Sequence, residues 1–313
     1  MHKNKKILKN ILQIIIVLFG ISFFTFSLTY LSPGDPAEIM LTECGHIPTP
    51  ELLAQTRAEL GLDKPFVKQY GTWVYSALQG DMGKSYSLKT SVAEKIKQAF
   101  FPTLNLSLLA LSFTLLISLP LGMLAAVKKD KWQDYLIRSF TFIGISVPSF
   151  WLGLIFLSIF GVTLKWVSVS GGKTDFQSMI LPALTIALAM SSKYTRQVRH
   201  IFLEELEKTY VTGARMRGIR EGIILWKHVL PNAMLPLITL LGLSLGSLLG
   251  GTAVVEIIYN WPGMGSMAVK AISYRDYPLI QAYVLLIALI YLIITMLVDF
   301  SYKYLDSRVK GVV

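Results

Sequence analysis

Residues 100–127 read FFPTLNLSLLALSFTLLISLPLGMLAAV and contain no charged side chain, and Lys128 and Lys129 follow at once. A helix needs roughly 20 consecutive apolar residues to cross the hydrocarbon core of a bilayer. This run is long enough to cross, and the two lysines mark the point at which the chain returns to water. The stretch therefore predicts a membrane-spanning helix.

Five other runs share this character, so we expect an all-α, polytopic membrane protein with six transmembrane helices. The predicted spans are residues 11–31, 100–127, 139–164, 179–192, 233–255 and 279–298. The fourth is the shortest and is expected to continue past Lys193 towards Arg196. The first follows a lysine-rich start, but it is longer than the apolar core of a signal peptide and lacks an A-x-A site, so we interpret it as an uncleaved helix.

The composition agrees with a membrane protein. Hydrophobic residues make up 53% of the chain and charged residues only 16%, whereas a soluble domain carries about 25% charged residues. Too few charges remain to cover a soluble surface, so much of the surface must face lipid. The single cysteine, Cys44, excludes an intrachain disulfide framework and a Cys-based zinc site.

The placement of the basic residues predicts the orientation of the chain. Lysine and arginine accumulate in cytoplasmic loops, and with the N-terminus inside the whole net charge of +11 falls on the cytoplasmic face. Both termini are then cytoplasmic. Topology explains the basicity, so no nucleic-acid partner is needed.

Three regions follow from this pattern. Residues 1–31 hold the basic N-terminus and first span, residues 32–99 form an extracytoplasmic segment, and residues 100–313 form the core with a long cytoplasmic loop at 196–232. In the outer segment Thr49-Pro50-Glu51 predicts a helix start, with Thr49 as the cap.

The cytoplasmic loop carries the most informative motif. It reads Thr209-Tyr210-Val-Thr-Gly-Ala214-Arg215-Met-Arg-Gly218 and, nine residues later, His228-Val-Leu230-Pro231-Asn232-Ala233. Ala214 stands four residues before Gly218, which predicts a small-residue helix face that another protein can approach closely. The alternative is an amphipathic helix resting on anionic lipid.

This loop resembles the coupling loop of ABC-importer permeases, whose general pattern is E-A-A-x-x-x-G-x9-I-x-L-P. The chain departs from that pattern at Thr212, Gly213 and His228. The variant Y-V-x-x-A-R-x-x-G with H-x-L-x-N-A, typical of B-type subunits of dipeptide, oligopeptide and nickel permeases, fits throughout. Further matching stretches extend over nearly the whole chain, among them Val147-Pro-Ser-Phe-Trp151 and residues 256–265.

The resemblance implies a type I importer permease without a catalytic site. It implies a second homologous permease, two ATP-binding subunits that hold ATP and magnesium, and an extracytoplasmic substrate-binding protein; this chain itself binds no cofactor. The implied ATPase-coupling residues are Tyr210, Ala214, Arg215, Gly218, His228, Leu230, Pro231 and Asn232. The outer segment is most similar to the nickel-import permease, so we expect nickel as cargo, free or chelated, with di- or oligopeptide import as the alternative.

Two features within the fifth span are candidates for packing or for the substrate pathway. Gly242, Gly246 and Gly250 recur every fourth residue, so helices can approach closely there, either within this subunit or against a second permease. Glu256 lies near the outer end of the span, where it either serves transport or caps the turn at Trp261-Pro262.

Weaker motifs indicate other functions, but each of them is incomplete. Cys44 and His46 could chelate a metal, but two ligands on a loop fall short of the usual three or four. Gly83-Lys84-Ser85 lacks the first glycine of a P-loop. Ser244 lies in a G-x-S-x-G pattern, as in hydrolases, with no histidine in any predicted span. An ion-coupled secondary transporter would need ionisable groups inside the spans, which are almost absent.

Overall fold

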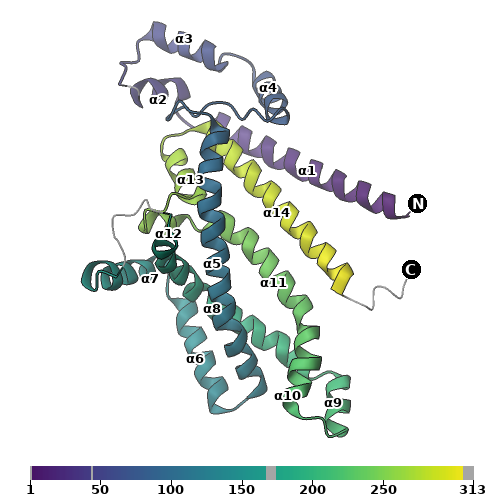
Figure 1. The fold of residues 1–313 in the computed structure, drawn as a ribbon. Helices are drawn as coiled ribbons and strands as arrows, with labels where there is room; N and C mark the ends of the chain where they lie inside the picture. Colours follow the sequence, from purple (N-terminus) through teal and green to yellow (C-terminus); the bar gives the residue numbers. More distant parts are fainter. Residues whose placement is uncertain (1, 44, 167–173, 306–313) are drawn as a thin grey trace. The chain divides into compact units, whose positions relative to one another are not determined.

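The computed structural model describes residues 2–43, 45–166 and 174–305, and the described chain is helical (Figure 1). No strand forms in these ranges beyond an isolated antiparallel bridge between Lys84 and Ser91. The elements are α1 (His2–Leu31), α2 (Pro36–Glu43), α3 (Pro50–Leu60), α4 (Phe66–Leu78), α5 (Val92–Val127), α6 (Trp132–Ser146), α7 (Ser149–Phe156), η1 (Leu157–Thr163), α8 (Phe176–Leu206), α9 (Thr209–Met216), α10 (Glu221–Ile223), η2 (Ile224–Val229), α11 (Leu230–Gly251), α12 (Ala253–Ile258), α13 (Met264–Ser273) and α14 (Tyr277–Leu305), where η1 and η2 are π-helical.

The helical, membrane-spanning architecture predicted from the sequence is confirmed. Four helices in the described ranges are long and apolar enough to cross a bilayer, and they match the predicted first, second, fifth and sixth spans, except that the fifth ends at Gly251 rather than at residue 255. The α6–η1 pair makes a fifth if its two arms count together. The helix start at Thr49 is also confirmed, because its hydroxyl accepts a hydrogen bond from the Leu52 amide at 3.4 Å.

The predicted third span, residues 139–164, is not one straight helix. The chain bends by 93° between α6 and the α7–η1 arm. Pro148 has no N–H to donate, and the residue before a proline is pushed away from helical dihedrals. Val147 accordingly has φ −87° and ψ 121°, which is extended backbone. The prediction of one straight span from 139 to 164 is therefore wrong, because it did not include a bend at Pro148.

The predicted fourth span lies in α8, which is not among the helices apolar enough to cross by composition. Its first half is apolar, and its second half carries Lys193, Arg196 and Arg199. The helix compensates by packing, since Ala183, Ala187 and other residues along it are buried inside the chain. Packing inside the chain therefore stabilises α8 as much as contact with lipid does.

The chain forms two compact units. The first comprises residues 1–102 and 263–292, and the second comprises residues 103–262 and 293–313. In the first unit Phe26 of α1 packs edge-on against Phe66 and Tyr70 of α4, with ring centroids 5.6 and 5.3 Å apart. Tyr70 also shares a 2.9 Å hydrogen bond with Ser22 of α1.

A second set of contacts in the first unit centres on the buried side chain of Asp276. Asp276, fully buried before α14, accepts hydrogen bonds from the hydroxyls of Ser85 and Ser87 and from the Ser87 amide. We call these hydrogen bonds the Asp276 clamp. It includes Ser85, the last residue of the P-loop-like stretch Gly83-Lys84-Ser85. Burial and the nearby charge of Asp276 raise the pKa of Tyr86 to about 12.

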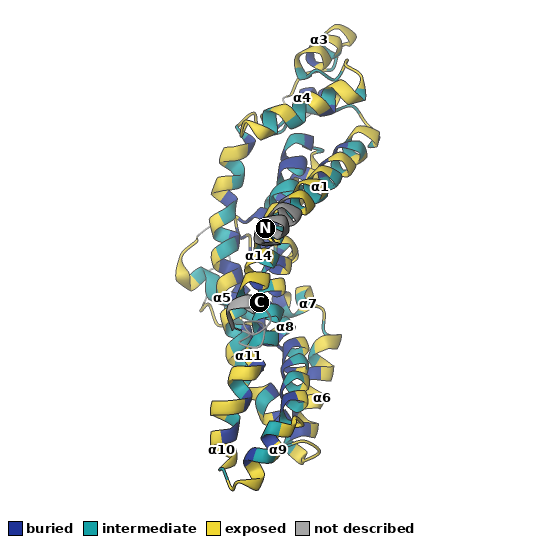
Figure 2. Cartoon of the chain, turned by 90° about the vertical axis from the view of Figure 1, so that its right-hand side faces the viewer, coloured by how far each residue is buried: buried dark blue, intermediate teal, exposed yellow. Residues whose placement is uncertain are grey.

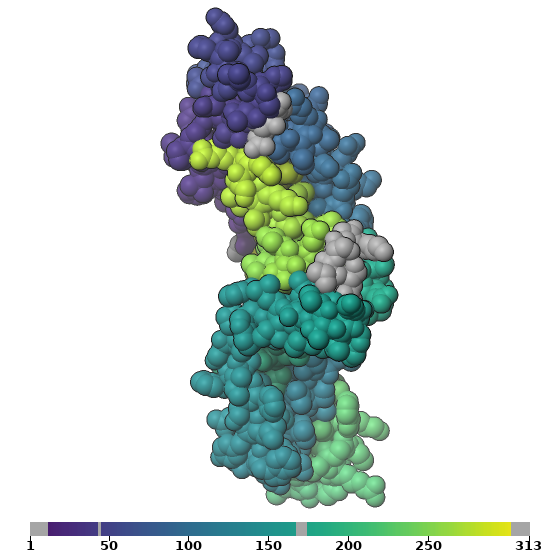
Figure 3. Space-filling view, turned by 90° about the vertical axis from the view of Figure 1, so that its left-hand side faces the viewer, coloured from purple at the N-terminus to yellow at the C-terminus, as the bar shows by residue number. Residues whose placement is uncertain are grey.

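The second unit depends on close contacts with α8. A Cβ added at Gly122 of α5 would lie 2.6 Å from the Val198 Cβ and 2.8 Å from the Thr195 carbonyl oxygen, so only glycine permits this approach. On α6, Asp134 is fully buried and accepts two hydrogen bonds from the Arg199 guanidinium, at 2.7 and 2.6 Å. Figure 3 shows the teal α6–α7 pair at the surface of this unit.

We expect Asp276→Ala to release the segment around Ser87. Hydrogen bonds to a charged group contribute about 1.5–3 kcal/mol each, so amide exchange at Ser87 and Leu88 should rise about tenfold or more. Hydrogen–deuterium exchange measures this directly. Ser273→Ala is the matched control, because its hydroxyl only bonds the Val269 carbonyl of its own helix. Unchanged exchange in the Asp276 variant would contradict the clamp.

Candidate functional site: the segment from α9 to α11

Helix α9 is fixed by its inner face. Val211 and Ala214 are buried in an apolar cluster, here called the coupling core, whose members come from α5, α8, α9, η2 and α11. Its buried members are Ala126, Val198, Phe202, Val211, Ala214, Ile224, Val229, Ala233 and Leu237. Fully burying a Val or Phe side chain contributes about 1.5–3 kcal/mol, so α9 is firmly attached to the helices around it.

Ala214 and Gly218 do not form the small-residue helix face predicted from their spacing. Ala214 points inward and is 5% exposed, so it is not available as an open contact surface. Gly218 is not on the helix, because α9 ends at Met216 and Gly218 has φ +70°. The spacing of four residues would align the two only if the helix continued through Gly218.

Gly218 instead terminates α9 in a Schellman motif. The Gly218 amide donates to the Arg215 carbonyl at 2.9 Å, and the Ile219 amide reaches back to the Ala214 carbonyl at 3.2 Å. Ile219 then packs against the coupling core. The left-handed backbone at Gly218 favours glycine, since a Cβ there costs roughly 1–2 kcal/mol.

A hydrogen-bonded carboxylate joins α8 to α9. Glu205, 5% exposed near the end of α8, accepts a 2.8 Å hydrogen bond from the Tyr210 hydroxyl and also pairs with Lys208. Tyr210 therefore positions α9 from within the chain. Neither Glu205 nor Lys208 was singled out from the sequence, because nothing in their spacing distinguishes them from solvated charges.

The outer face of the segment is basic and partly apolar. Arg215 pairs with Glu221 at 2.7 Å, and this hydrogen bond holds the pKa of Arg215 above its usual range. Met216, at 85% exposed, and Trp226, at 59%, extend into solvent beside it. Figure 2 shows this exposure at α9 and α10. The sequence motif accepts any residue at position 216, so nothing in the motif distinguishes Met216.

The remaining predicted coupling residues lie at the start of α11. His228 is exposed in η2, and its carbonyl accepts a 2.7 Å hydrogen bond from the Asn232 side-chain amide. Leu230 packs against the coupling core, and Pro231 occupies the first turn of α11, where its missing N–H costs little. These residues form the rigid entry into α11.

Two family models cover nearly all of the chain. Residues 118–311 match "Binding-protein-dependent transport system inner membrane component", and residues 4–107 match the corresponding N-terminal model. The first match alone spans more than half of the sequence. The chain belongs to this family.

The permease assignment agrees with curated relatives. The chain is 37% identical over 304 residues to the glutathione transport system permease protein GsiC of Salmonella paratyphi A, covering 97% of this chain and 98% of the relative. It is 35% identical, with the same coverage, to the GsiC protein of Escherichia coli strain K12. The chain is thus a permease subunit of an ABC importer and a multi-pass protein of the bacterial cytoplasmic membrane.

A solved structure shares the fold of the permease. Inward-facing MetNI, a methionine ABC transporter, matches with a TM-score of 0.57 and 19% identity over 68% of this chain and 96% of that chain. At this identity the match supports the fold alone.

The glycines of the permease's α11 serve different environments. A Cβ on Gly242 would lie 2.2 Å from the Val298 Cγ2 of α14, so this glycine permits a close helix contact within the subunit. Gly246 is buried and Gly250 is exposed. Between the first two, Ser244 is buried and hydrogen-bonds with the Tyr194 hydroxyl of α8.

Glu256 of the permease is fully buried in α12. Its carboxylate accepts hydrogen bonds from the hydroxyls of Thr103 at 2.7 Å and Thr252 at 2.9 Å, which ties α5 to α12. Its main-chain carbonyl accepts from the Trp261 amide at 2.7 Å. The backbone of Glu256 thus closes the turn, while its side chain joins two helices.

The structure describes only one of the two metal-ligand candidates predicted from the sequence. Cys44 lies outside the described residues, and His46 is exposed. No group of three or more metal-ligating side chains occurs in the part of the permease that the structure describes.

We expect Gly218→Ala to destabilise the end of α9. The substitution forces an alanine into left-handed backbone, at a cost of roughly 1–2 kcal/mol, and thermal unfolding of the purified permease should report a lower Tm. Gly213→Ala is the matched control, because Gly213 is helical and has open space around its Cβ position. Equal Tm values for the two variants would contradict the Schellman motif.

Proposed function

We propose that this permease imports a short peptide, with glutathione or a similar small peptide as its cargo. The observation that carries this proposal is the 35–37% identity over 304 residues to permeases named for glutathione transport. Nickel, expected from the outer segment, is named in neither of these relatives. The peptide alternative therefore replaces nickel as the preferred cargo.

The permease works within a larger complex in this proposal. A second permease completes the substrate pathway, and an extracytoplasmic binding protein delivers the peptide. Two separate ATPase subunits bind ATP and magnesium on the cytoplasmic side, so the permease takes no part in the hydrolysis itself. The family description, an inner-membrane component of a binding-protein-dependent system, supports this division of labour.

The α9 segment is the proposed contact with an ATPase subunit. Its inner face is held in the coupling core, and its outer face presents Met216, Arg215 and Arg217. An exposed apolar side chain flanked by arginines has the composition of a protein-contact surface. The Arg215–Glu221 pair is largely exposed and contributes little to stability, so Arg215 is free to change partners on docking.

Movement of α9 would pass to the spans through the coupling core. Phe202 of α8, Ile224 of η2 and Ala233 of α11 all pack in the cluster that holds α9. Close-packed interiors transmit displacement rather than absorb it. Docking that shifts α9 would therefore move α8 and α11 with it, which is the alternating-access step of the proposal.

Uptake assays distinguish the possible cargoes. Cells that carry the gene should accumulate radiolabelled glutathione in an ATP-dependent manner, and cells that lack it should not. Excess unlabelled peptide should compete, whereas excess nickel should not. Gene-dependent uptake of radiolabelled nickel without peptide uptake would overturn the peptide assignment and leave the permease assignment intact.

A substitution at the tip of α9 tests the docking face. Met216→Asp should lower co-purification of the ATPase subunits with a tagged permease by about thirtyfold or more, because buried interface anchors contribute about 2 kcal/mol or more. The Tm of the isolated permease should not change, since the side chain is 85% exposed. Val67→Asp on α4, at 77% exposed, is the matched control. Full co-purification of the Met216 variant would place docking elsewhere.

A further inference from the structure

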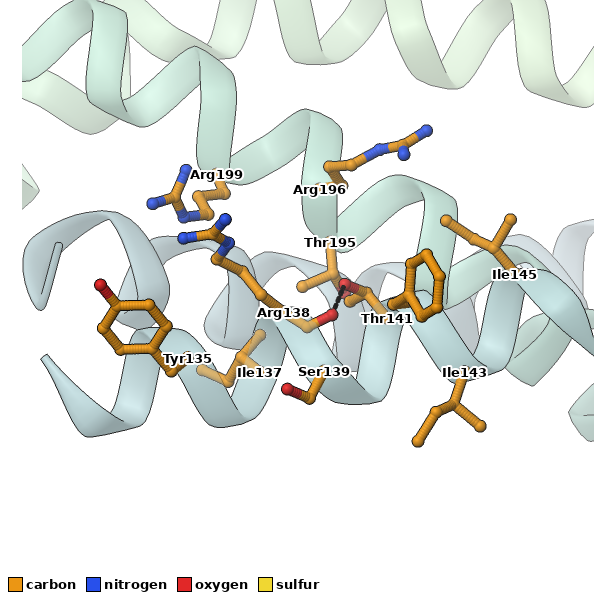
Figure 4. A pocket seen from close by; sticks show the side chains of 11 residues that line it. Tyr135, Ile137, Arg138, Ser139, Thr141, Ile143, Ile145, Thr195, Arg196 and Arg199 are labelled. Atoms are coloured by element: carbon orange, nitrogen blue, oxygen red, sulfur yellow. Dashed lines mark hydrogen bonds between the residues drawn. The ribbon is translucent and has the colours of Figure 1, made fainter. Parts of the chain in front are cut away.

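A cavity of about 740 Å³ opens between α6 and α8 in the second unit (Figure 4). Three arginines line it, and apolar side chains complete its walls. The lining residues are Tyr135, Ile137, Arg138, Ser139, Thr141, Phe142, Ile143, Ile145, Thr195, Arg196 and Arg199. Its volume lies in the range of small-molecule pockets, about 300–1,000 Å³.

The cavity has an excess of positive charge. Arg199 is neutralised by the buried carboxylate of Asp134, and the charge of Asp130 also acts on it. Arg138 and Arg196 are exposed and form no ion pair within the described residues. The residues that line the cavity include three arginines and no carboxylate, and the buried Asp134 forms an ion pair with only one of them, Arg199.

The two exposed arginines differ in direction. Figure 4 shows the Arg138 guanidinium extending towards Tyr135 and Arg199, while Arg196 extends away from them on the α8 side. The Arg138 Cζ lies 5.6 Å from the centroid of the Tyr135 ring, where the ring face attracts a cation. The two exposed arginines therefore line the same cavity from different helices, Arg138 from α6 and Arg196 from α8.

The surroundings of the cavity are apolar. Phe142 at 76% and Ile143 at 61% exposed belong to the cavity lining, and Phe140 at 69% exposed lies close to them in the sequence of α6. These side chains belong to a helix of the α6–η1 pair, which is apolar enough to enter the bilayer. A basic recess that opens onto exposed apolar side chains matches a ligand with an anionic head and hydrocarbon tails.

We propose that this cavity binds an anionic phospholipid of the membrane leaflet that borders the predicted cytoplasmic face. The lipid headgroup lies in the cavity beside Arg138, Arg196 adds positive charge from the α8 side, and the acyl chains follow Phe142 and Ile143 along α6. Basic pockets between spanning helices on the cytoplasmic side are suited to acidic headgroups. The bound lipid would brace α6 against α8 beside the Asp134–Arg199 pair.

Two chemical features favour lipid over other occupants. A soluble phosphate would satisfy the arginines but leave the exposed phenylalanine and isoleucine side chains in contact with water. A guanidinium pairs with phosphate through parallel hydrogen bonds, which are stronger than neutral ones. A lipid satisfies both the charged recess and the apolar wall at once.

Native mass spectrometry of the full-length permease tests the proposal. The detergent-solubilised protein is titrated with phosphatidylglycerol and, separately, with phosphatidylcholine. Wild-type protein should retain the anionic lipid more strongly, and the Arg138→Gln/Arg196→Gln variant should lose affinity by about tenfold or more, since each basic residue contributes about 1 kcal/mol. Arg138→Lys/Arg196→Lys should restore most of the binding.

The control variant is Arg217→Gln/Lys227→Gln, which removes two exposed cations of the same unit away from the cavity. It should retain phosphatidylglycerol like the wild type. Equal retention by the wild type and the Arg138→Gln/Arg196→Gln variant would overturn the site, as would equal binding of the two lipids. Competition by inorganic phosphate at similar concentration would reduce the proposal to a phosphate site without lipid.

Discussion

The interior of a bilayer offers no hydrogen-bond partners to a peptide backbone, and this constraint shapes the whole permease. Each spanning segment must satisfy its own N–H and C=O groups, which only a helix achieves within one segment. Where the helical pattern is interrupted at Thr252, between α11 and α12, the residue is buried inside the chain. The buried carboxylates of Asp134 and Glu256 likewise lie in hydrogen-bonded positions between helices.

The same constraint explains why so much of the architecture was predictable. Apolar runs must be long to span a bilayer, so composition alone locates the helices at residues 11–31, 100–127 and 279–298 and most of the predicted fifth span, which ends at Gly251 instead of residue 255. The bend at Pro148 was harder to predict, because prolines also occur inside spans without breaking them, as Pro182 does in α8. What decides between a bend and a straight helix is the packing around the proline, which the sequence does not display.

The functional segment shows a sharper limit of the same kind. The spacing of Ala214 and Gly218 predicts one small-residue helix face, which the structure contradicts, whereas their role in ATPase coupling stays a prediction. A motif records which residue types occur together; it does not record whether a small side chain faces inward, as Ala214 does, or ends a helix, as Gly218 does. Met216, the most exposed apolar residue of the segment, falls where the motif accepts any residue.

The helix stop at Gly218 has a consequence for the length of α9. A helix of eight residues rises about 12 Å, and the left-handed turn holds it at that length whatever side chains decorate its outer face. The length of α9 is therefore set by the backbone turn at Gly218 and not by the side chains on its outer face. In the proposed complex, side chains such as Met216 and Arg217 can therefore differ to fit an ATPase surface without changing the length of α9.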